Sequence, residues 1–206
     1  MPLVMKKAAF VLALCLIAGA SASGQNAAPA RPAIAAKFHE IEAAARRGDA
    51  IAQYNLGLLY YKGQGVAQDH AQAAAWFRKA ADQGEAKAQY NLGVLYELGQ
   101  GVAQDYAQAA GWFRKAADQR LAIAQYNLGL LYYKGQGVSQ DHSQTAHWLR
   151  KAADQGEAKA QYNLGVLYYN GQGVAQDHAL AADWFRKAAD QGNANARVAL
   201  ERIGVR

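Results

Sequence analysis

Cysteine is almost absent from this sequence. The single one among 206 residues is Cys15, and it lies in a short apolar run at residues 8–18. That run follows Lys6 and Lys7 and precedes the small residues 19–23. Basic, then apolar, then small residues is the order typical of a secretory signal peptide. We therefore predict that residues 1–23 are removed, leaving a mature chain without a thiol for a disulfide or a zinc–thiolate site.

Long apolar runs are lacking as well. A membrane-spanning helix needs about 20 predominantly apolar residues, and the run at residues 8–18 is roughly half as long as that. We expect no stable membrane insertion after cleavage of the signal. The chain is predicted to be periplasmic or secreted.

Neither sign of charge gathers in one block. The formal net charge is +6, and removal of Lys6 and Lys7 lowers it by two. The remaining basic residues recur singly beside Asp and Gln. A mild, dispersed positive charge affects solubility and encounter rather than fold, so we predict no nucleic-acid partner.

What the sequence does contain is one stretch present four times. Residues 88–99 read AQYNLGVLYELG, and similar stretches begin at Ala52, Ala124 and Ala160, with a step of 36 residues. Periods of 20 to 50 residues mark solenoids, propellers or arrays. A weaker 72-residue period is also present, because units one and three share Leu-Leu-Tyr-Tyr-Lys while units two and four share Glu-Ala-Lys-Ala-Gln.

Each unit has the pattern of a helical hairpin. Apolar side chains in residues 52–60 are spaced i, i+4, i+7 and i+8, as on one face of a helix. Gly63 suits the left-handed end of that helix, and Asp69 suits the N-cap of a second helix. Gly84 ends the second helix. A hairpin cannot bury both its faces alone, so neighbouring units must stack.

Two positions refine this picture. Gly57 lies inside the first helix and recurs in every unit, which indicates close packing of the two helices despite the cost of glycine in a helix. Arg120 stands where the other units have glycine. It must adopt a left-handed conformation, at a cost of roughly 1–2 kcal/mol, or end the helix differently, and we predict a change in repeat angle there.

The predicted fold is all-α, a solenoid of four 36-residue helical hairpins plus capping helices. The signal peptide is assigned to 1–23 and a flexible lead to 24–36. A single helical-repeat domain follows at 37–206. It comprises a cap at 37–48, repeats at about 50–84, 86–120, 122–156 and 158–192, and a C-terminal cap at 193–206.

The repeat resembles the Sel-one-like repeat, a relative of the tetratricopeptide repeat. In the second unit the matching residues are Ala88, Leu92, Gly93, Leu95, Tyr96, Gly99, Gly101, Val102, Asp105, Ala109, Trp112, Ala116 and Ala117. The resemblance implies a right-handed α-α superhelix that acts as an adaptor in protein complexes. Bacterial members with signal peptides are associated with envelope signalling, polysaccharide export and host interaction.

Two other functions stay open. Some members of this family are rich in cysteine, and a few of those are linked to β-lactam binding or hydrolysis, although the predicted mature chain lacks such cysteines. A structural spacer or self-associating module is the other alternative.

The resemblance also places a binding surface, because the first helix of each unit lines the concave face in tetratricopeptide-like stacks. Tyrosine offers a rigid ring with a polar tip, and asparagine offers both a donor and an acceptor, so a row of both would suit an extended peptide. The alternative interpretation is that these tyrosines pack between repeats. The predicted partner-binding residues are Tyr54, Asn55, Tyr61, Lys62, Tyr90, Asn91, Glu97, Leu98, Tyr126, Asn127, Tyr133, Lys134, Tyr162, Asn163, Tyr169 and Asn170.

No catalytic residue, metal site or cofactor is predicted. His70, His142 and His178 share one position in their units, but equivalent positions of stacked hairpins lie on the order of 10 Å apart, too far to bind one metal ion. We expect these histidines to be exposed in the first turn of the second helix. Ser and Thr side chains gather near His142 in the third unit only. The sequence therefore predicts no enzyme.

Overall fold

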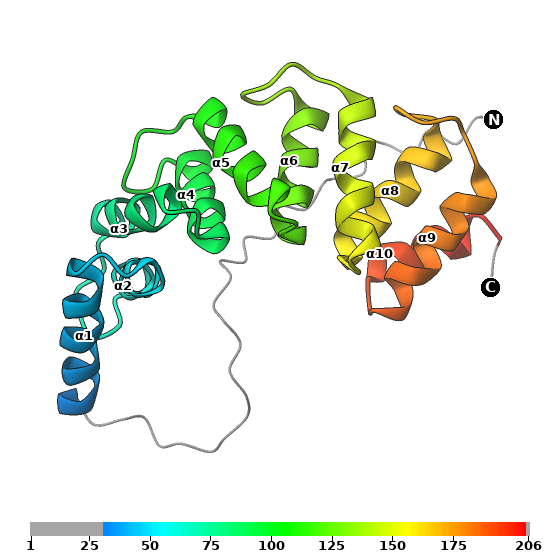
Figure 1. The fold of residues 1–206 in the computed structure, drawn as a ribbon. Helices are drawn as coiled ribbons and strands as arrows, with labels where there is room; N and C mark the ends of the chain where they lie inside the picture. Colours follow the sequence, from blue (N-terminus) through cyan, green and yellow to red (C-terminus); the bar gives the residue numbers. More distant parts are fainter. Residues whose placement is uncertain (1–30, 205–206) are drawn as a thin grey trace.

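The computed structural model describes residues 31–204, and helices are the only regular elements in that range (Figure 1). The first is α1 (Arg31–Arg46). The four hairpins and the last helix are α2 (Ala50–Lys62), α3 (His70–Asp82), α4 (Ala86–Leu98), α5 (Tyr106–Asp118), α6 (Ala122–Lys134), α7 (His142–Asp154), α8 (Ala158–Asn170), α9 (His178–Asp190) and α10 (Ala194–Arg202). The predicted signal peptide, with Cys15, lies outside the described residues.

The helices pack mainly on their neighbours along the chain. Within a unit the first helix packs on the second, and each second helix also contacts the first helix of the next unit. At the two ends, α1 covers α2 and α10 covers α9. Figure 1 shows the hairpins following one another in a single arc. This confirms the all-α solenoid, in which each unit is stabilised by the units beside it.

The first helix of the stack is longer than the predicted cap. Because α1 begins at Arg31, it includes the last residues of the segment assigned to a flexible lead. Pro32 is compatible with this start, since a proline is tolerated in the first turn of a helix. The alanines that follow favour the helix.

The helix ends follow the local signals of the sequence. Gly63 ends α2 in the left-handed region, with φ 67°, and its N–H donates to the Leu59 carbonyl. Asp69 caps α3, its Oδ1 accepting from the Gln72 N–H at 2.9 Å. The other units repeat both features at Gly99, Gly135 and Gly171 and at Asp105, Asp141 and Asp177.

The glycine inside each first helix permits a close approach of the second. A Cβ built on Gly57 would lie 2.6 Å from Phe77 Cδ1, and one on Gly93 would lie 2.7 Å from Phe113 Cδ1. Phe77 is fully buried, so its ring has no free space to move into. The predicted reason for a glycine at this position is confirmed.

Arg120 adopts the left-handed conformation, with φ 66°, and it is the one non-glycine residue with positive φ in residues 31–204. Its N–H donates to the Ala117 carbonyl at 3.0 Å, as Gly84 N–H donates to Ala81 at the same joint of another unit. The helix therefore ends in the same way in spite of the side chain. The change in repeat angle at this joint stays a prediction.

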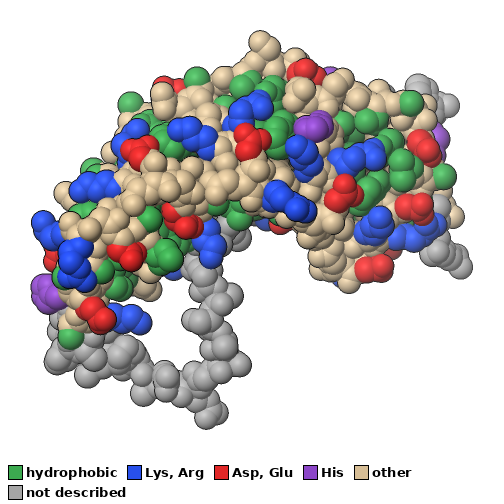
Figure 2. All heavy atoms as spheres, in the orientation of Figure 1, with side chains coloured by type: hydrophobic (Ala, Val, Ile, Leu, Met, Phe, Trp, Pro, Cys, Tyr) green, Lys and Arg blue, Asp and Glu red, His purple; other side chains and the backbone are tan. Residues whose placement is uncertain are grey.

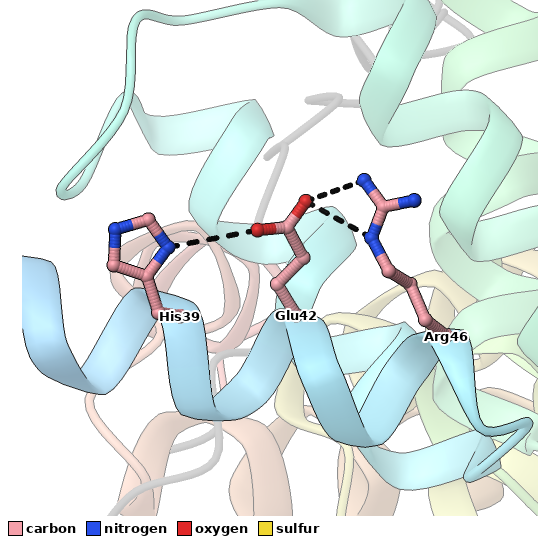
Figure 3. Close-up of polar contacts among 3 residues, drawn as sticks. All are labelled: His39, Glu42 and Arg46. Atoms are coloured by element: carbon pink, nitrogen blue, oxygen red, sulfur yellow. Dashed lines mark hydrogen bonds and ion pairs between the residues drawn. The ribbon is translucent and has the colours of Figure 1, made fainter.

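The α1 helix carries a small group of charged side chains (Figure 3). Glu42 accepts two hydrogen bonds from the Arg46 guanidinium, at 2.7 Å from Nη2 and 3.2 Å from Nε, and its other oxygen lies 3.7 Å from His39 Nδ1. The hydrogen bond from Arg46 lowers the pKa of the Glu42 carboxyl. A polar outer helix of this kind is what the end of a solenoid needs to stay soluble.

Candidate functional site

The tyrosines of the Ala-Gln-Tyr-Asn motif lie between repeats. Tyr54, Tyr90 and Tyr126 are 5%, 1% and 2% exposed, and Tyr162 is half-buried. The Tyr54 ring lies 5.9 Å from the ring of Phe77 in its own unit. The structure corrects the groove assignment here, because three of these four rings are interior residues that fill the joints of the stack.

The asparagines that follow these tyrosines join one unit to the next. Asn127 Nδ2 donates to the Tyr90 hydroxyl at 3.3 Å, and Asn163 Nδ2 donates to the Tyr126 hydroxyl at 3.4 Å. Asn91 is fully buried. The predicted Tyr–Asn row therefore exists, but it is a buried seam through the solenoid rather than a surface for a peptide.

Burial also changes the ionisation of this seam. Burial raises the pKa of Tyr54 to about 12, against a smaller lowering by a hydrogen bond with Asn91. Tyr126 is raised to about 12 in the same way, opposed by Asn163. Both phenols remain neutral at any physiological pH, as hydrogen-bonding interior groups should.

The ends of the first helices remain accessible. In this part of the predicted groove, Tyr61 is half-buried and its hydroxyl donates to Gln100 Oε1 of the next unit at 3.3 Å. Tyr133 and Tyr169 are likewise half-buried. We call these residues and their exposed or half-buried neighbours the helix-end row: Tyr61, Lys62, Leu98, Tyr133, Lys134, Tyr169 and Asn170.

Glu97 interrupts the helix-end row. It occupies the position of Tyr61 in the second unit, yet it is 8% exposed. Burial raises the pKa of its carboxyl, and the positive charge of Lys134 opposes this rise. Glu97 is thus a buried acid below the row rather than a surface contact of the kind predicted.

Two of the three histidines of one register are less exposed than expected. His70 and His142 are half-buried, and His178 is exposed. Each ring packs on the tyrosine one residue before the end of the preceding helix, with ring centres 4.9 Å apart for Tyr61–His70 and 4.8 Å apart for Tyr169–His178. They are therefore packing partners of the helix-end row. Within residues 31–204, no three His, Cys, Asp or Glu side chains come together as a metal site.

Of the hydroxyl groups near His142, that of Thr145 has a local structural role. Thr145 is fully buried, and its Oγ1 donates to the Asp141 carbonyl at 2.8 Å. His147 is largely exposed, and its pKa is lowered by partial desolvation and by the positive charges of Lys151 and Arg114. The Thr145 hydroxyl thus takes part in the helix start.

An open hollow of about 530 Å³ lies where α1 and α2 meet the start of α4. Its apolar lining includes Ile51, which is 65% exposed, and the half-buried Leu58. Asn55, which unlike Asn91 and Asn163 is not buried, lies here as well. We call this feature the N-terminal hollow. It is a concave part of the surface that contains the predicted groove residues Tyr54, Asn55 and Lys62.

The repeats match a known family model, the Sel1 repeat, at residues 50–85, 86–121, 122–157 and 158–193. The chain belongs to the Sel1 repeat family. Sel1 repeats generally mediate protein–protein interactions, and Sel1 repeat proteins are generally non-enzymatic scaffolds. No curated protein matches the sequence.

Solved Sel1 structures share this fold. A protective antigen present in uropathogenic Escherichia coli strains, which displays an SLR fold, is 43% identical with a TM-score of 0.76 over 77% of this chain. A Sel1 repeat protein from Oxalobacter formigenes is 39% identical with a TM-score of 0.75 over 82%. This chain spans 34% and 49% of the lengths of those two proteins.

Cysteine rich protein B of Helicobacter pylori is more distant. It is 23% identical, with a TM-score of 0.51 over 63% of this chain and 92% of its own. This likeness shows the fold alone.

The surface of this Sel1 repeat protein agrees with the dispersed charge of its sequence. Figure 2 shows Lys and Arg side chains spread over the whole visible face rather than gathered in one patch. Among residues 31–204, no helix has the length and apolar character needed to cross a bilayer.

The sequence reasoning missed a second link between Sel1 units, on the second helices. The Arg78 guanidinium lies 5.6 Å from the centre of the Tyr96 ring and 5.8 Å from that of Trp112, both in the next unit. Lys115 Nζ lies 3.8 Å from the same Trp112 ring. Such cation–π contacts stabilise a joint by roughly 0.5–1 kcal/mol at exposed sites. The available signal was the fixed spacing of Trp, Arg and Lys in every second helix.

It also missed the glutamine of the motif. Gln89 is 5% exposed; its Nε2 donates to the Ala81 carbonyl at 3.1 Å, and its Oε1 accepts from Gln119 Nε2 at 2.8 Å. One side chain thus ties the ends of two successive second helices. The sequence signal for this link was the glutamine that recurs inside an otherwise apolar motif. A buried polar side chain needs hydrogen-bonding partners.

Proposed function

We propose that this protein is an adaptor that binds a protein or peptide partner along the exposed side of its first helices, in the periplasm or outside the cell. The helix-end row supports the proposal most directly. It brings Tyr61, Tyr133 and Tyr169 to equivalent places of three units, each flanked by Lys or Asn. Half-buried tyrosines held by packing suit binding surfaces, because a rigid ring loses little entropy when it contacts a partner.

The pathway belongs to the same proposal. Envelope signalling, assembly or host interaction would fit a secreted Sel1 repeat protein, and no nucleic acid or stable membrane insertion is proposed. Location can be tested by itself. Mass spectrometry of the protein recovered from periplasm and medium should find a chain that begins near residue 24, whereas an intact N-terminus in the cytoplasm would refute it.

The proposed surface can be tested by capture from an envelope extract. The test variant carries Tyr61→Ala, Tyr133→Ala and Tyr169→Ala. The matched control carries Gln72→Ala, Gln108→Ala and Gln144→Ala, which also changes one side chain in each of three units but on the second helices. The test variant should lose a partner that the wild type and the control both retain.

The buried tyrosines are unsuitable for this test. Removing a fully buried aromatic side chain costs about 3–5 kcal/mol, so alanine at Tyr90 or Tyr126 would damage the stack itself. If the correctly folded helix-end variant keeps every partner of the wild type, this surface does not bind them and the proposal is wrong.

A further inference from the structure

The 72-residue duplication provides two copies of one set of side chains in different surroundings. The first copy lines the N-terminal hollow between units one and two, and the second lies between units three and four. The paired residues are Ile51 and Ile123, Leu58 and Leu130, Lys62 and Lys134, Glu85 and Glu157, and Lys87 and Lys159.

The two copies differ in exposure although their residues are the same. Ile51 is 65% exposed, whereas Ile123 is half-buried and packs on the cluster that contains Tyr90 and Val94 of α4. Leu130 is 3% exposed, whereas Leu58 is only half-buried. For Ile123 the neighbour accounts for the difference, because α4 precedes α6 as a first helix, whereas α2 is preceded by the lone second helix α1. The hollow is therefore a face in which the rest of the described chain leaves the apolar side chains of Ile51 and Leu58 uncovered.

Positive charge surrounds this uncovered face. Lys37, Lys62 and Lys87 line the hollow, and none of them forms an ion pair with another described residue. Glu85 is the one acidic residue of the lining, and its Oε1 accepts from the Lys87 N–H at 3.2 Å. A carboxylate at a helix N-terminus is stabilised by the helix dipole, so Glu85 already interacts favourably with the N-terminus of α4. With three lysines and one glutamate, the rim of the hollow has a net positive charge.

We propose that the N-terminal hollow docks a segment of the partner in which a large apolar side chain is flanked by Asp or Glu. The apolar side chain would cover Ile51 and Leu58, and the carboxylates would meet Lys62 and Lys87. This proposal rests on the proposed function and names the chemistry of the segment that the adaptor takes. Complementary charge of this kind fixes orientation and accelerates encounter.

The probe is a fluorescein-labelled peptide in which Leu and Phe are flanked by Asp, and binding is followed by fluorescence anisotropy. Lys87→Glu and Lys159→Glu form a matched pair, since both lysines follow a glutamate that caps their helix. We expect Lys87→Glu to weaken binding by about tenfold, and Lys159→Glu to leave it unchanged. Ile51→Asp should weaken binding as strongly, while a peptide with Lys in place of Asp should not bind.

Equal effects of Lys87→Glu and Lys159→Glu would overturn the proposal, because they would indicate general charge attraction. Tight binding of the Lys peptide, or an Ile51→Asp variant with wild-type affinity, would overturn it too. Self-association of the protein that Ile51→Asp abolishes would assign the hollow to a second copy instead.

The result of the peptide-binding experiment can be distinguished from the result of the capture experiment. If the helix-end variant loses its partner and the acidic peptide does not bind, the hollow proposal alone fails. If neither experiment shows binding, the proposed function fails with it.

Discussion

Alanine at Gly57 and alanine at Gly129 are the same change in two helices of identical sequence, yet we predict different outcomes. Helices α2 and α6 both read AIAQYNLGLLYYK. A Cβ on Gly57 would lie 2.6 Å and 2.7 Å from Cδ1 and Cε1 of Phe77. A Cβ on Gly129 would lie 3.2 Å from Cδ2 and Cγ of Leu149. The second helix presents Phe77 to Gly57 and Leu149 to Gly129, and this difference in the facing residue separates the two outcomes.

The magnitude follows from two opposing contributions. Alanine inside a helix is favoured over glycine by about 0.5–1 kcal/mol, and overpacking a core costs typically about 1–3 kcal/mol. Phe77 is fully buried and planar, so at Gly57 the clash dominates and we expect a loss of about 1–2 kcal/mol. The end of Leu149 can move by a few tenths of an ångström. Gly129→Ala should therefore range from neutral to about 1 kcal/mol stabilising.

Hydrogen exchange is the suitable assay, because repeats of a solenoid open locally and global unfolding need not be two-state. Gly57→Ala should accelerate exchange of amides in α2 and α3, and Gly129→Ala should not accelerate it in α6 and α7. The control is Gly57→Ala combined with Phe77→Leu, read against Phe77→Leu alone as a double-mutant cycle. Equal acceleration by the two glycine variants, or no coupling to Phe77→Leu, would refute the reasoning.

Three further predictions concern Arg120, Glu97 and the buried tyrosines. Arg120→Gly should raise the free energy of unfolding by about 1 kcal/mol, because φ 66° is strained for arginine; urea denaturation that shows a loss would contradict this. Glu97→Gln should stabilise the protein at pH 7, since burial raises the pKa of Glu97 and its charged form opposes folding. That gain should vanish in acid, where Glu97 is protonated in both states, and denaturation at two pH values measures it. Because the pKa of Tyr54 and of Tyr126 is raised to about 12, stability should fall as pH rises from about 10 towards 12. A Tyr54→Phe and Tyr126→Phe variant should lose less stability over that range, and an identical fall in both proteins would count against buried phenols.

Local features of this fold could be predicted from the sequence alone. The 36-residue period, the left-handed end at Gly63 and the N-cap at Asp69 depend on residues close together in the chain, so the pattern contains all the information they need. The glycine at position 57 was predictable for the same reason, as a recurrent exception to helix propensity. Membership of the Sel1 family follows from these same positions.

The accessible surface, by contrast, depends on which unit lies next to which. Tyr90 and Asn91 look like surface groups within one helix, but each is covered by partners from adjoining hairpins, which no single repeat contains. The burial of Gln89 likewise depends on neighbouring units, because its hydrogen-bonding partners lie at the ends of two different second helices.

Ile51 and Ile123 show the division most clearly. Their helices are identical in sequence, so sequence alone determines that both positions are helical and apolar. Only the tertiary structure decides that Ile123 packs on the core cluster that includes Tyr90 and Val94 of α4, while Ile51 remains 65% exposed. The physical reason is that burial depends on which segments pack against a residue in the folded protein. Helix α2 lacks the preceding first helix that α6 has.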